Sequence, residues 1–243
     1  FVHTPLRPES LDEVHVTARI QSSAPIMDVT LDFEAFDAPY SNVDASASIP
    51  MRDDGVEDNG IPGDGIYGAR IPPQPSQTLV RYRVTVSDTD GRTWTWPDEE
   101  EPNPNGAYFV YDGEEETQLP AYFIIIQSGQ LATLQANLTA FQQDIFTTRI
   151  KEYVSGTVVI DGITYDNVRL RYRSDRTHPK KSYKIRFNKL EYFNDMSSLD
   201  TNYDWPGTEK VASNLFMLLG QSENIAMELM RFYTNGRFSG VFV

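Results

Sequence analysis

The feature that most constrains this chain is an alternation of basic and apolar side chains in residues 168–189, VRLRYRSDRTHPKKSYKIRFNK. A period of two is that of a β-strand, whose successive side chains point to opposite faces of a sheet. The segment predicts two strands joined by a loop at residues 174–181, with one apolar face and one basic face. A basic sheet surface of this kind suits a phosphate-bearing ligand. The alternating basic residues are Arg169, Arg171, Arg173, Lys184 and Arg186.

Charge is divided unevenly along the chain. Residues 1–116 contain 7 Arg, no Lys and 23 acidic residues, a formal charge of −16, whereas residues 117–243 contain 14 basic and 12 acidic residues, a formal charge of +2. Such asymmetry predicts two domains, 1–116 and 117–243, joined at the acidic, Pro- and Gly-containing segment 98–120. Each region is long enough to form a core of its own.

The first region reads as an all-β immunoglobulin-like or fibronectin-III-like sandwich. Three runs alternate apolar and polar residues, at 13–18, 29–33 and 80–86, and turn residues separate them. Short alternating strands over about a hundred residues are typical of such sandwiches.

The second region reads as an α/β (α+β) domain with a mostly antiparallel sheet. Leucines at three- and four-residue spacing predict a core-facing helix over 128–144, and a second apolar stripe predicts a helix over 209–219 that ends at Gly220. Strands are expected near 119–127, 148–160, 165–174 and 181–188. Residues 227–234 and 237–243 should form a hairpin, because Asn235-Gly236 favours a type I′ turn.

Residues 119–243 resemble the CotH family, the spore-coat-protein-H-like atypical protein kinases. The matching motifs are the IDGxxYxNV segment at 160–168, the VRxR strand at 168–171, KKSYxIxF at 180–187 and NGxxxG at 235–240. The chain departs from the family after the VRxR strand, where the family has Gly-Asn-Ser-Ser and this chain has Tyr172, Arg173, Ser174 and Asp175. A remodelled turn at this position favours a non-catalytic module as the alternative.

The resemblance implies an N-terminal, truncated part of a kinase domain. It implies that Lys181 contacts nucleotide phosphates, with Lys180 as the second choice and Arg171 as a supporting contact. In a regular strand, Lys180 would lie on the same face as Lys184, which is the basic face, and Lys181 on the same face as Tyr183. A bend at Ser182 would therefore be needed for Lys181 to join the basic face. ATP, Mg²⁺ or Mn²⁺ and a protein acceptor belong to the full-length kinase, whose metal-binding and catalytic acids follow the NGxxxG motif. Because the chain begins at Phe1 and ends shortly after that motif, we expect a fragment that is inactive alone.

Residues 51–91 resemble the Ig-like modules that precede CotH domains in large bacterial surface proteins, which implies an extracellular or cell-surface location. The loop MRDDGVEDNGIPGDG within this segment is rich in acids and glycine. Its Asp53, Asp54, Asp58 and Asp64 offer hard oxygen ligands for Ca²⁺. The alternative is a solvated turn, since Asp, Asn and Gly are also preferred by tight turns.

Other ligands are less favoured by the sequence. Trp94 and Trp96 lie on one face of a strand, where they either stack on a polysaccharide or pack in the core, and we expect at least one of them to be buried in the core. The net charge of −14 opposes nucleic-acid binding. No cysteine is present, so thiol-rich metal sites are excluded.

The longest apolar run, residues 121–126, is far shorter than the roughly 20 residues of a membrane span, so no membrane-spanning segment is expected.

Overall fold

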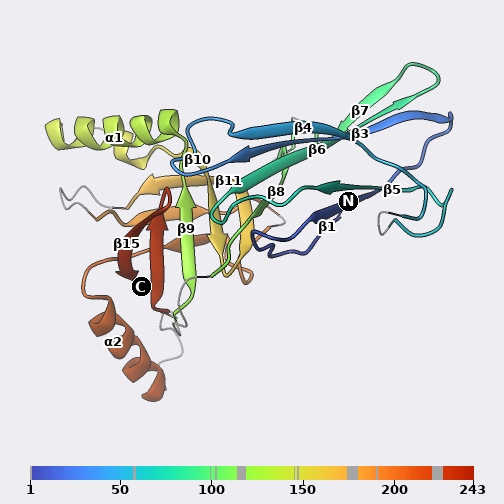
Figure 1. Ribbon diagram of the computed structural model, residues 1–243. Helices are drawn as coiled ribbons and strands as arrows, with labels where there is room; N and C mark the ends of the chain where they lie inside the picture. Colours follow the sequence, from blue (N-terminus) through green and yellow to red (C-terminus); the bar gives the residue numbers. More distant parts are fainter. Residues whose placement is uncertain are drawn as a thin grey trace. The chain divides into compact units, whose positions relative to one another are not determined.

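The computed structural model describes residues 2–56, 59–98, 100–101, 103–113, 119–144, 146, 148–173, 180–189, 191–220 and 227–243. Within these residues the chain is rich in β-structure, with mainly antiparallel strand pairs (Figure 1). It divides into two compact units. The first comprises Phe1–Glu114 with Gly162–Asp166, and the second comprises Glu115–Asp161 with Asn167–Val243.

The first unit contains a three-stranded sheet of order β1-β2-β5 and a five-stranded sheet of order β4-β3-β6-β7, in which β8 also pairs with β6. Its strand pairs are antiparallel. The strands are β1 (Val2–Thr4), β2 (Val14–Arg19), β3 (Ile26–Phe36), β4 (Ala45–Pro50), β5 (Ile66–Ile71), β6 (Leu79–Asp88), β7 (Thr93–Trp96) and β8 (Gly106–Phe109).

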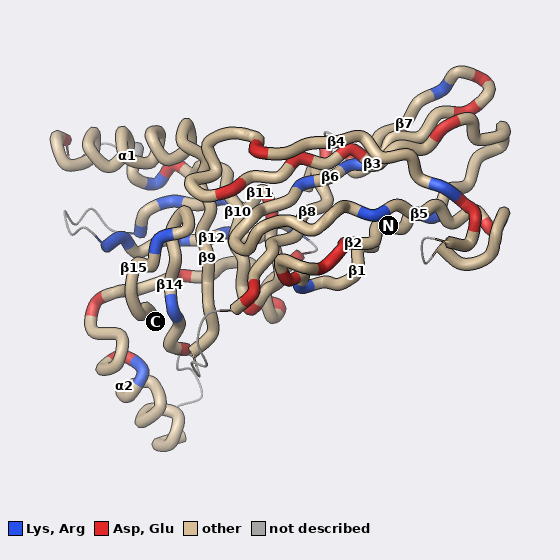
Figure 2. Tube along the Cα trace, viewed as in Figure 1, with Lys and Arg blue, Asp and Glu red and all other residues tan. Residues whose placement is uncertain are grey.

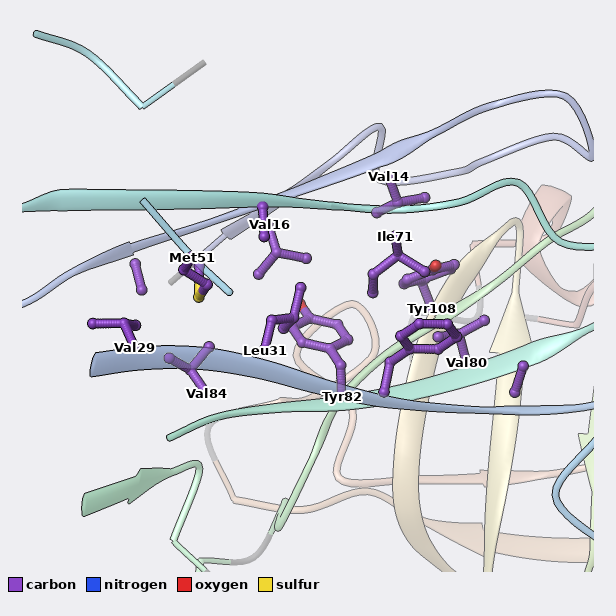
Figure 3. Packing of buried hydrophobic residues seen from close by; sticks show 14 of the residues in the cluster. Val14, Val16, Val29, Leu31, Met51, Ile71, Val80, Tyr82, Val84 and Tyr108 are labelled. Carbon is purple, nitrogen blue, oxygen red and sulfur yellow. The ribbon is translucent and has the colours of Figure 1, made fainter. Parts of the chain in front are cut away.

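Both sheets contribute to one hydrophobic core (Figure 3). Val14 and Val16 of β2 and Ile71 of β5 enter it from the smaller sheet, while Leu31 of β3 and Val84 of β6 enter it from the larger one. The alternation predicted for β2, β3 and β6 is confirmed, since their apolar residues are buried and the intervening polar ones are less so. Burying an aliphatic side chain of this size contributes about 1.5–3 kcal/mol.

The second unit contains a seven-stranded sheet of order β13-β12-β11-β10-β9-β14-β15, in which β9 and β14 pair in parallel, and only the start of β11, residues 163–166, belongs to the first unit. The mostly antiparallel sheet expected from the sequence is thus present. The elements are β9 (Ala121–Ile125), α1 (Ser128–Gln143), the short 3₁₀ helix η1 (Arg149–Lys151), β10 (Val154–Ile160), β11 (Ile163–Tyr172), β12 (Tyr183–Arg186), β13 (Ser198–Asp200), α2 (Pro206–Leu218), β14 (Met230–Thr234) and β15 (Arg237–Phe242).

The two helices differ in how much apolar surface they bury. In α1, Leu134 and Leu138 are buried as predicted, and Leu131 is half-buried. In α2, Leu215 is 55% exposed and Val211 68% exposed. The helix and its stop at Gly220, where φ is +76°, agree with the sequence, but its apolar stripe is not covered by the residues that the structure describes. No helix in the described part of the chain is both long and apolar enough to cross a membrane.

The hairpin of β14 and β15 has the predicted turn. Asn235 and Gly236 have φ of +47° and +75°, as a type I′ turn requires. The Asn235 side chain also reaches the end of β9, where its Oδ1 accepts the Ile126 N–H at 2.7 Å and its Nδ2 donates to the Ile126 carbonyl at 2.8 Å. Through these two hydrogen bonds, a residue in the turn links the hairpin to the end of a strand more than a hundred residues earlier in the sequence.

Candidate functional site: a cationic pocket in the second unit

The register of β11 and β12 separates two faces of the second sheet. Tyr172 lies opposite Tyr183, and Arg171 lies opposite Lys184. Residues opposite each other share a face and neighbouring residues do not. One face therefore carries the two tyrosines and the other the alternating basic residues. In Figure 2, Lys and Arg are frequent along the strands of this sheet.

The basic face makes contacts within the unit. The guanidinium groups of Arg169, Arg171 and Arg186 lie 5.9, 5.5 and 4.8 Å from the centre of the Tyr153 ring. Arg171 also donates from Nη1 to the Tyr172 carbonyl at 2.8 Å. Cation–π contacts at such partly exposed sites contribute about 0.5–1 kcal/mol each. A basic surface is present, as predicted, and an aromatic ring occupies its centre.

Asp200 on β13 neutralises part of the same face. Its carboxylate lies 3.1 Å from the Lys184 ammonium and 4.0 Å from Arg173 Nε. The side chains are partly exposed, so each pair contributes little to stability. Their effect is to lower the positive potential that this face presents to a ligand.

The tyrosine face borders a pocket of about 810 Å³. This volume lies in the range of small-molecule sites. None of the described lining residues is acidic. The lining consists of Leu131, Gln135, Leu138 and Thr139 of α1, Tyr172, Lys180, Lys181 and Tyr183 of the central strands and their connection, and Thr234, Arg237, Phe238 and Ser239 of the hairpin.

Tyr183 and Tyr172 form the aromatic wall of the pocket. Their ring centres are 5.4 Å apart, and Tyr183 lies 5.9 Å from Phe232 of β14 in a stacked arrangement. Burial raises the pKa of both phenols, with the nearby Tyr172 adding to the effect at Tyr183. The two hydroxyls are therefore neutral over the physiological pH range and serve as hydrogen-bonding groups.

Lys181 and Lys180 bring positive charge into the pocket. The Lys181 ammonium lies 6.0 Å from the centre of the Tyr172 ring, and desolvation by burial lowers its pKa below the usual value. Lys180 lies over Gly240, where a methyl group would stand 2.6 Å from its Nζ. With φ of +125°, Gly240 also has a backbone conformation that disfavours other residues. The lysine of the KKSY motif therefore lies against the glycine of the NGxxxG motif, and the backbone conformation is what favours glycine at this position.

The structure brings together two of the three residues expected to contact a nucleotide. Lys180 and Lys181 line the pocket, and β12 begins only at Tyr183, so strand alternation does not fix the direction of either lysine. Arg171 does not line the pocket, because it lies on the opposite face of β11 from Tyr172.

Sequence reasoning missed Arg237 and the polar side of α1. Arg237 is the first residue of β15 and contributes a third cation to the pocket, while Gln135 and Thr139 come from the helix. The sequence signal that could have predicted the position of Arg237 is the Asn-Gly turn, because this turn pairs β15 with β14 and so places Arg237 beside Thr234. The helix residues carried no comparable signal, since only tertiary packing brings them to the sheet.

The acidic loop of the first unit uses its carboxylates to bind its own backbone. Asp53 accepts N–H groups from Gly63 at 2.8 Å and Gly65 at 2.9 Å, and Asp64 accepts those of Ile61 at 3.2 Å and Ile66 at 3.0 Å. These bonds are those of a tight turn.

The same loop is where Ca²⁺ was predicted. Asp54 accepts the Val56 N–H at 3.0 Å, and Asp58 lies outside the described residues. Over the described ranges, no group of three or more His, Cys, Asp or Glu residues is placed to hold a metal ion. The Ca²⁺ site therefore stays a prediction.

Comparisons with known proteins add little to this geometry. No family model matches the chain, and no curated protein matches its sequence. Among solved structures, the chain is similar to the cycloalternan-forming enzyme from Listeria monocytogenes in complex with a pentasaccharide substrate, with 11% sequence identity and a TM-score of 0.30. The match covers 80% of this chain and 14% of that one. At this TM-score the likeness carries no argument about fold or function.

Proposed function

We propose that the second unit is the N-terminal part of a CotH-like atypical protein kinase domain and that its pocket binds the phosphates of a nucleotide. The observation that supports this most directly is the meeting of two separate motifs at one pocket. Lys180 and Lys181 come from KKSY, and Gly240, over which Lys180 lies, comes from NGxxxG. These motifs stand about fifty residues apart in the sequence.

The pocket offers the cationic part of a phosphoryl-transfer site. Phosphates are bound by Lys and Arg side chains, and a cavity of this volume accommodates a nucleotide. Lys181 is the first contact, because partial burial strengthens its attraction to an anion. Lys180 and Arg237 are the second and third. Arg171 faces the other side of the sheet and supports β11 through its contact with Tyr153.

The residues present do not fit a metal ion. The described lining residues include no carboxylate, whereas kinases hold Mg²⁺ or Mn²⁺ with acids. In the family that the sequence resembles, those acids follow the NGxxxG motif. The activity we propose for these 243 residues is therefore nucleotide binding, and transfer of phosphate to a protein acceptor is proposed for the full-length kinase alone.

The first unit is proposed to be an immunoglobulin-like module of an exported or surface-associated bacterial protein. Its two sheets around a single core support this, together with the resemblance of residues 51–91 to such modules. The competing proposal is a non-catalytic surface or adhesion module, in which the second unit is a degenerate lobe that binds no nucleotide and the two units serve only to bind polysaccharide or a protein partner. Nucleotide binding discriminates the two.

The test is calorimetric titration of the 243-residue chain with ATP, without added metal. We expect ATP to bind and adenosine not to bind, because the pocket contributes charge for the phosphates. Lys181→Ala should weaken ATP binding about tenfold, since hydrogen bonds to charged groups contribute about 1.5–3 kcal/mol. Lys184→Ala is the matched control, because Lys184 lies on the opposite face and pairs with Asp200.

The titration has clear negative outcomes. Absence of ATP binding at millimolar concentration in the folded chain would exclude the proposal and favour the non-catalytic module. Equal weakening by Lys181→Ala and Lys184→Ala would show that ATP is attracted to general positive charge rather than to the pocket.

A further inference from the structure

A second pocket, in the first unit, has a different chemistry. It has a volume of about 450 Å³ and lies at the end of the core where β2 ends and β3 begins. Its apolar floor comes from Ile20, Ile26 and Val86. The other lining residues are Arg19, Gln21, Ser22, Ser23, Arg92 and Trp94.

Trp94 forms the aromatic wall of this pocket. It pairs across the strands with Val86, and Trp96 pairs with Val84, so both indoles lie on the core side of β7. Both remain half-exposed, Trp94 at 46% and Trp96 at 47%. The expectation that at least one of them is buried in the core is therefore wrong. β7 is an edge strand of its sheet, so the core covers these two side chains incompletely.

The charge of the pocket is opposite to that of its surroundings. Residues 1–116 carry 23 acids and 7 arginines without lysine, yet two of those arginines, Arg19 and Arg92, line the pocket. None of the described lining residues is acidic. Arg92 lies 3.7 Å from Asp90, but both side chains are more than half exposed, so this pair is weak and easily exchanged for a ligand.

The walls of the pocket are fixed by hydrogen bonds. Asp88 is fully buried, and its Oδ1 accepts the N–H groups of Asp90 at 2.9 Å and Arg92 at 3.0 Å. The Asp88 N–H also donates to the Arg92 carbonyl at 3.1 Å. At the floor, the Ile20 N–H donates to the Gly65 carbonyl at 2.9 Å. The backbones that carry Arg92 and Ile20 are therefore held in place before any ligand binds, which lowers the entropic cost of binding.

We propose that this pocket binds an acidic sugar, a pyranose ring with an anionic substituent, within a polysaccharide. A pyranose is apolar on its C–H faces and polar at its rim. Trp94 and the apolar floor match the ring face, the hydroxyls of Ser22 and Ser23 with the amide of Gln21 match the ring hydroxyls, and Arg19 with Arg92 match the anion. The site is independent of the nucleotide pocket, because every lining residue belongs to the first unit.

The proposal is tested by calorimetric titration of the full chain with a tetrasaccharide of galacturonic acid, a sulfated galactose tetrasaccharide and the neutral galactose tetrasaccharide. Binding of either charged sugar, with at least tenfold weaker binding of the neutral one, is the expected result. The two charged probes distinguish a carboxylate from a sulfate as the preferred anion. Binding should weaken as salt increases, because exposed charges are screened.

Variants of the lining residues distinguish binding in this pocket from nonspecific binding elsewhere on the first unit. Trp94→Ala and the double change Arg19→Ala with Arg92→Ala should each lower affinity about tenfold or more. Trp96→Ala is the matched control, because Trp96 lies on the same strand and face with almost the same exposure but outside the pocket.

Circular dichroism before each titration confirms that the variants are folded. The proposal is overturned by absence of binding, by equal affinity for the neutral tetrasaccharide, or by equal losses in Trp94→Ala and Trp96→Ala. None of these results bears on ATP binding, which involves the second unit.

Discussion

At the scale of single residues, Asn235 combines two roles that are separable by mutation. It occupies the left-handed region at φ of +47°, and its side chain makes two hydrogen bonds to Ile126. Asn235→Gly removes the two bonds but keeps a residue suited to this φ, so it should cost about 1 kcal/mol for each bond. Asn235→Ala should cost about a further 1 kcal/mol, since alanine is strained at positive φ.

These two changes are compared by urea unfolding with pulsed hydrogen exchange, read by mass spectrometry on peptides from β9 and from the hairpin. Arg237→Ala, at the other side of the turn, is the control for a change in the hairpin that leaves Asn235 intact. Equal stability of Asn235→Gly and wild type would mean that the bonds to Ile126 contribute nothing. Equal stability of Asn235→Gly and Asn235→Ala would mean that the conformation at this residue is unstrained.

At the scale of elements, a pair of leucines tests how differently the two helices are held. Leu138 on α1 is 8% exposed, whereas Leu215 on α2 is 55% exposed. Leu138→Ala should destabilise the second unit by about 2–5 kcal/mol, because it leaves a cavity beside the sheet. Leu215→Ala should change stability by less than about 0.5 kcal/mol, as for most surface positions.

Alanine is a good helix former in both variants, so the difference reports on packing rather than on helix propensity. The free energy of unfolding of the second unit is the quantity to compare. A loss for Leu215→Ala as large as that for Leu138→Ala would contradict the exposure of α2 and indicate that its apolar stripe is buried in solution.

Elements were easier to predict from the sequence than contacts between them. The alternation in β2, β6 and β11 reflects a local rule, because each strand must turn one face toward a core. Apolar spacing likewise predicted both helices. It could not predict that the apolar stripe of α1 is buried whereas that of α2 is exposed. Lys180 and Lys181 could be selected by motif, yet their position beside α1 and Gly240 depends on long-range packing that no local pattern encodes.

At the scale of the whole molecule, the two units should respond differently to acid, because His3 lies in the first one. Its Nδ1 is 2.8 Å from the Tyr82 hydroxyl, and its ring contacts Tyr82 and Tyr108, with centres 5.9 and 5.4 Å away. Desolvation by burial lowers the pKa of His3, and a hydrogen bond with the Leu6 backbone offsets only part of this. The folded first unit therefore favours the neutral imidazole.

The sign of the pH effect follows from that preference. In the unfolded chain His3 takes up a proton near pH 6.5, whereas in the folded unit protonation requires a lower pH. The stability that His3 contributes is therefore present above about pH 6.5 and is lost as the pH falls toward the folded-state pKa.

Urea unfolding between pH 7.5 and 5.5, followed by exchange pulses at one fixed pH, measures both units in the same sample. In wild type the midpoint of the first unit should fall on acidification. In His3→Gln, whose amide does not titrate and keeps a hydrogen-bonding group for the Tyr82 hydroxyl, it should fall less. The second unit should give the same midpoints in the two proteins, because His3 lies outside it. If His3→Gln left the acid response of the first unit unchanged, that response would come from other groups, and the burial of His3 would not be part of what stabilises this unit.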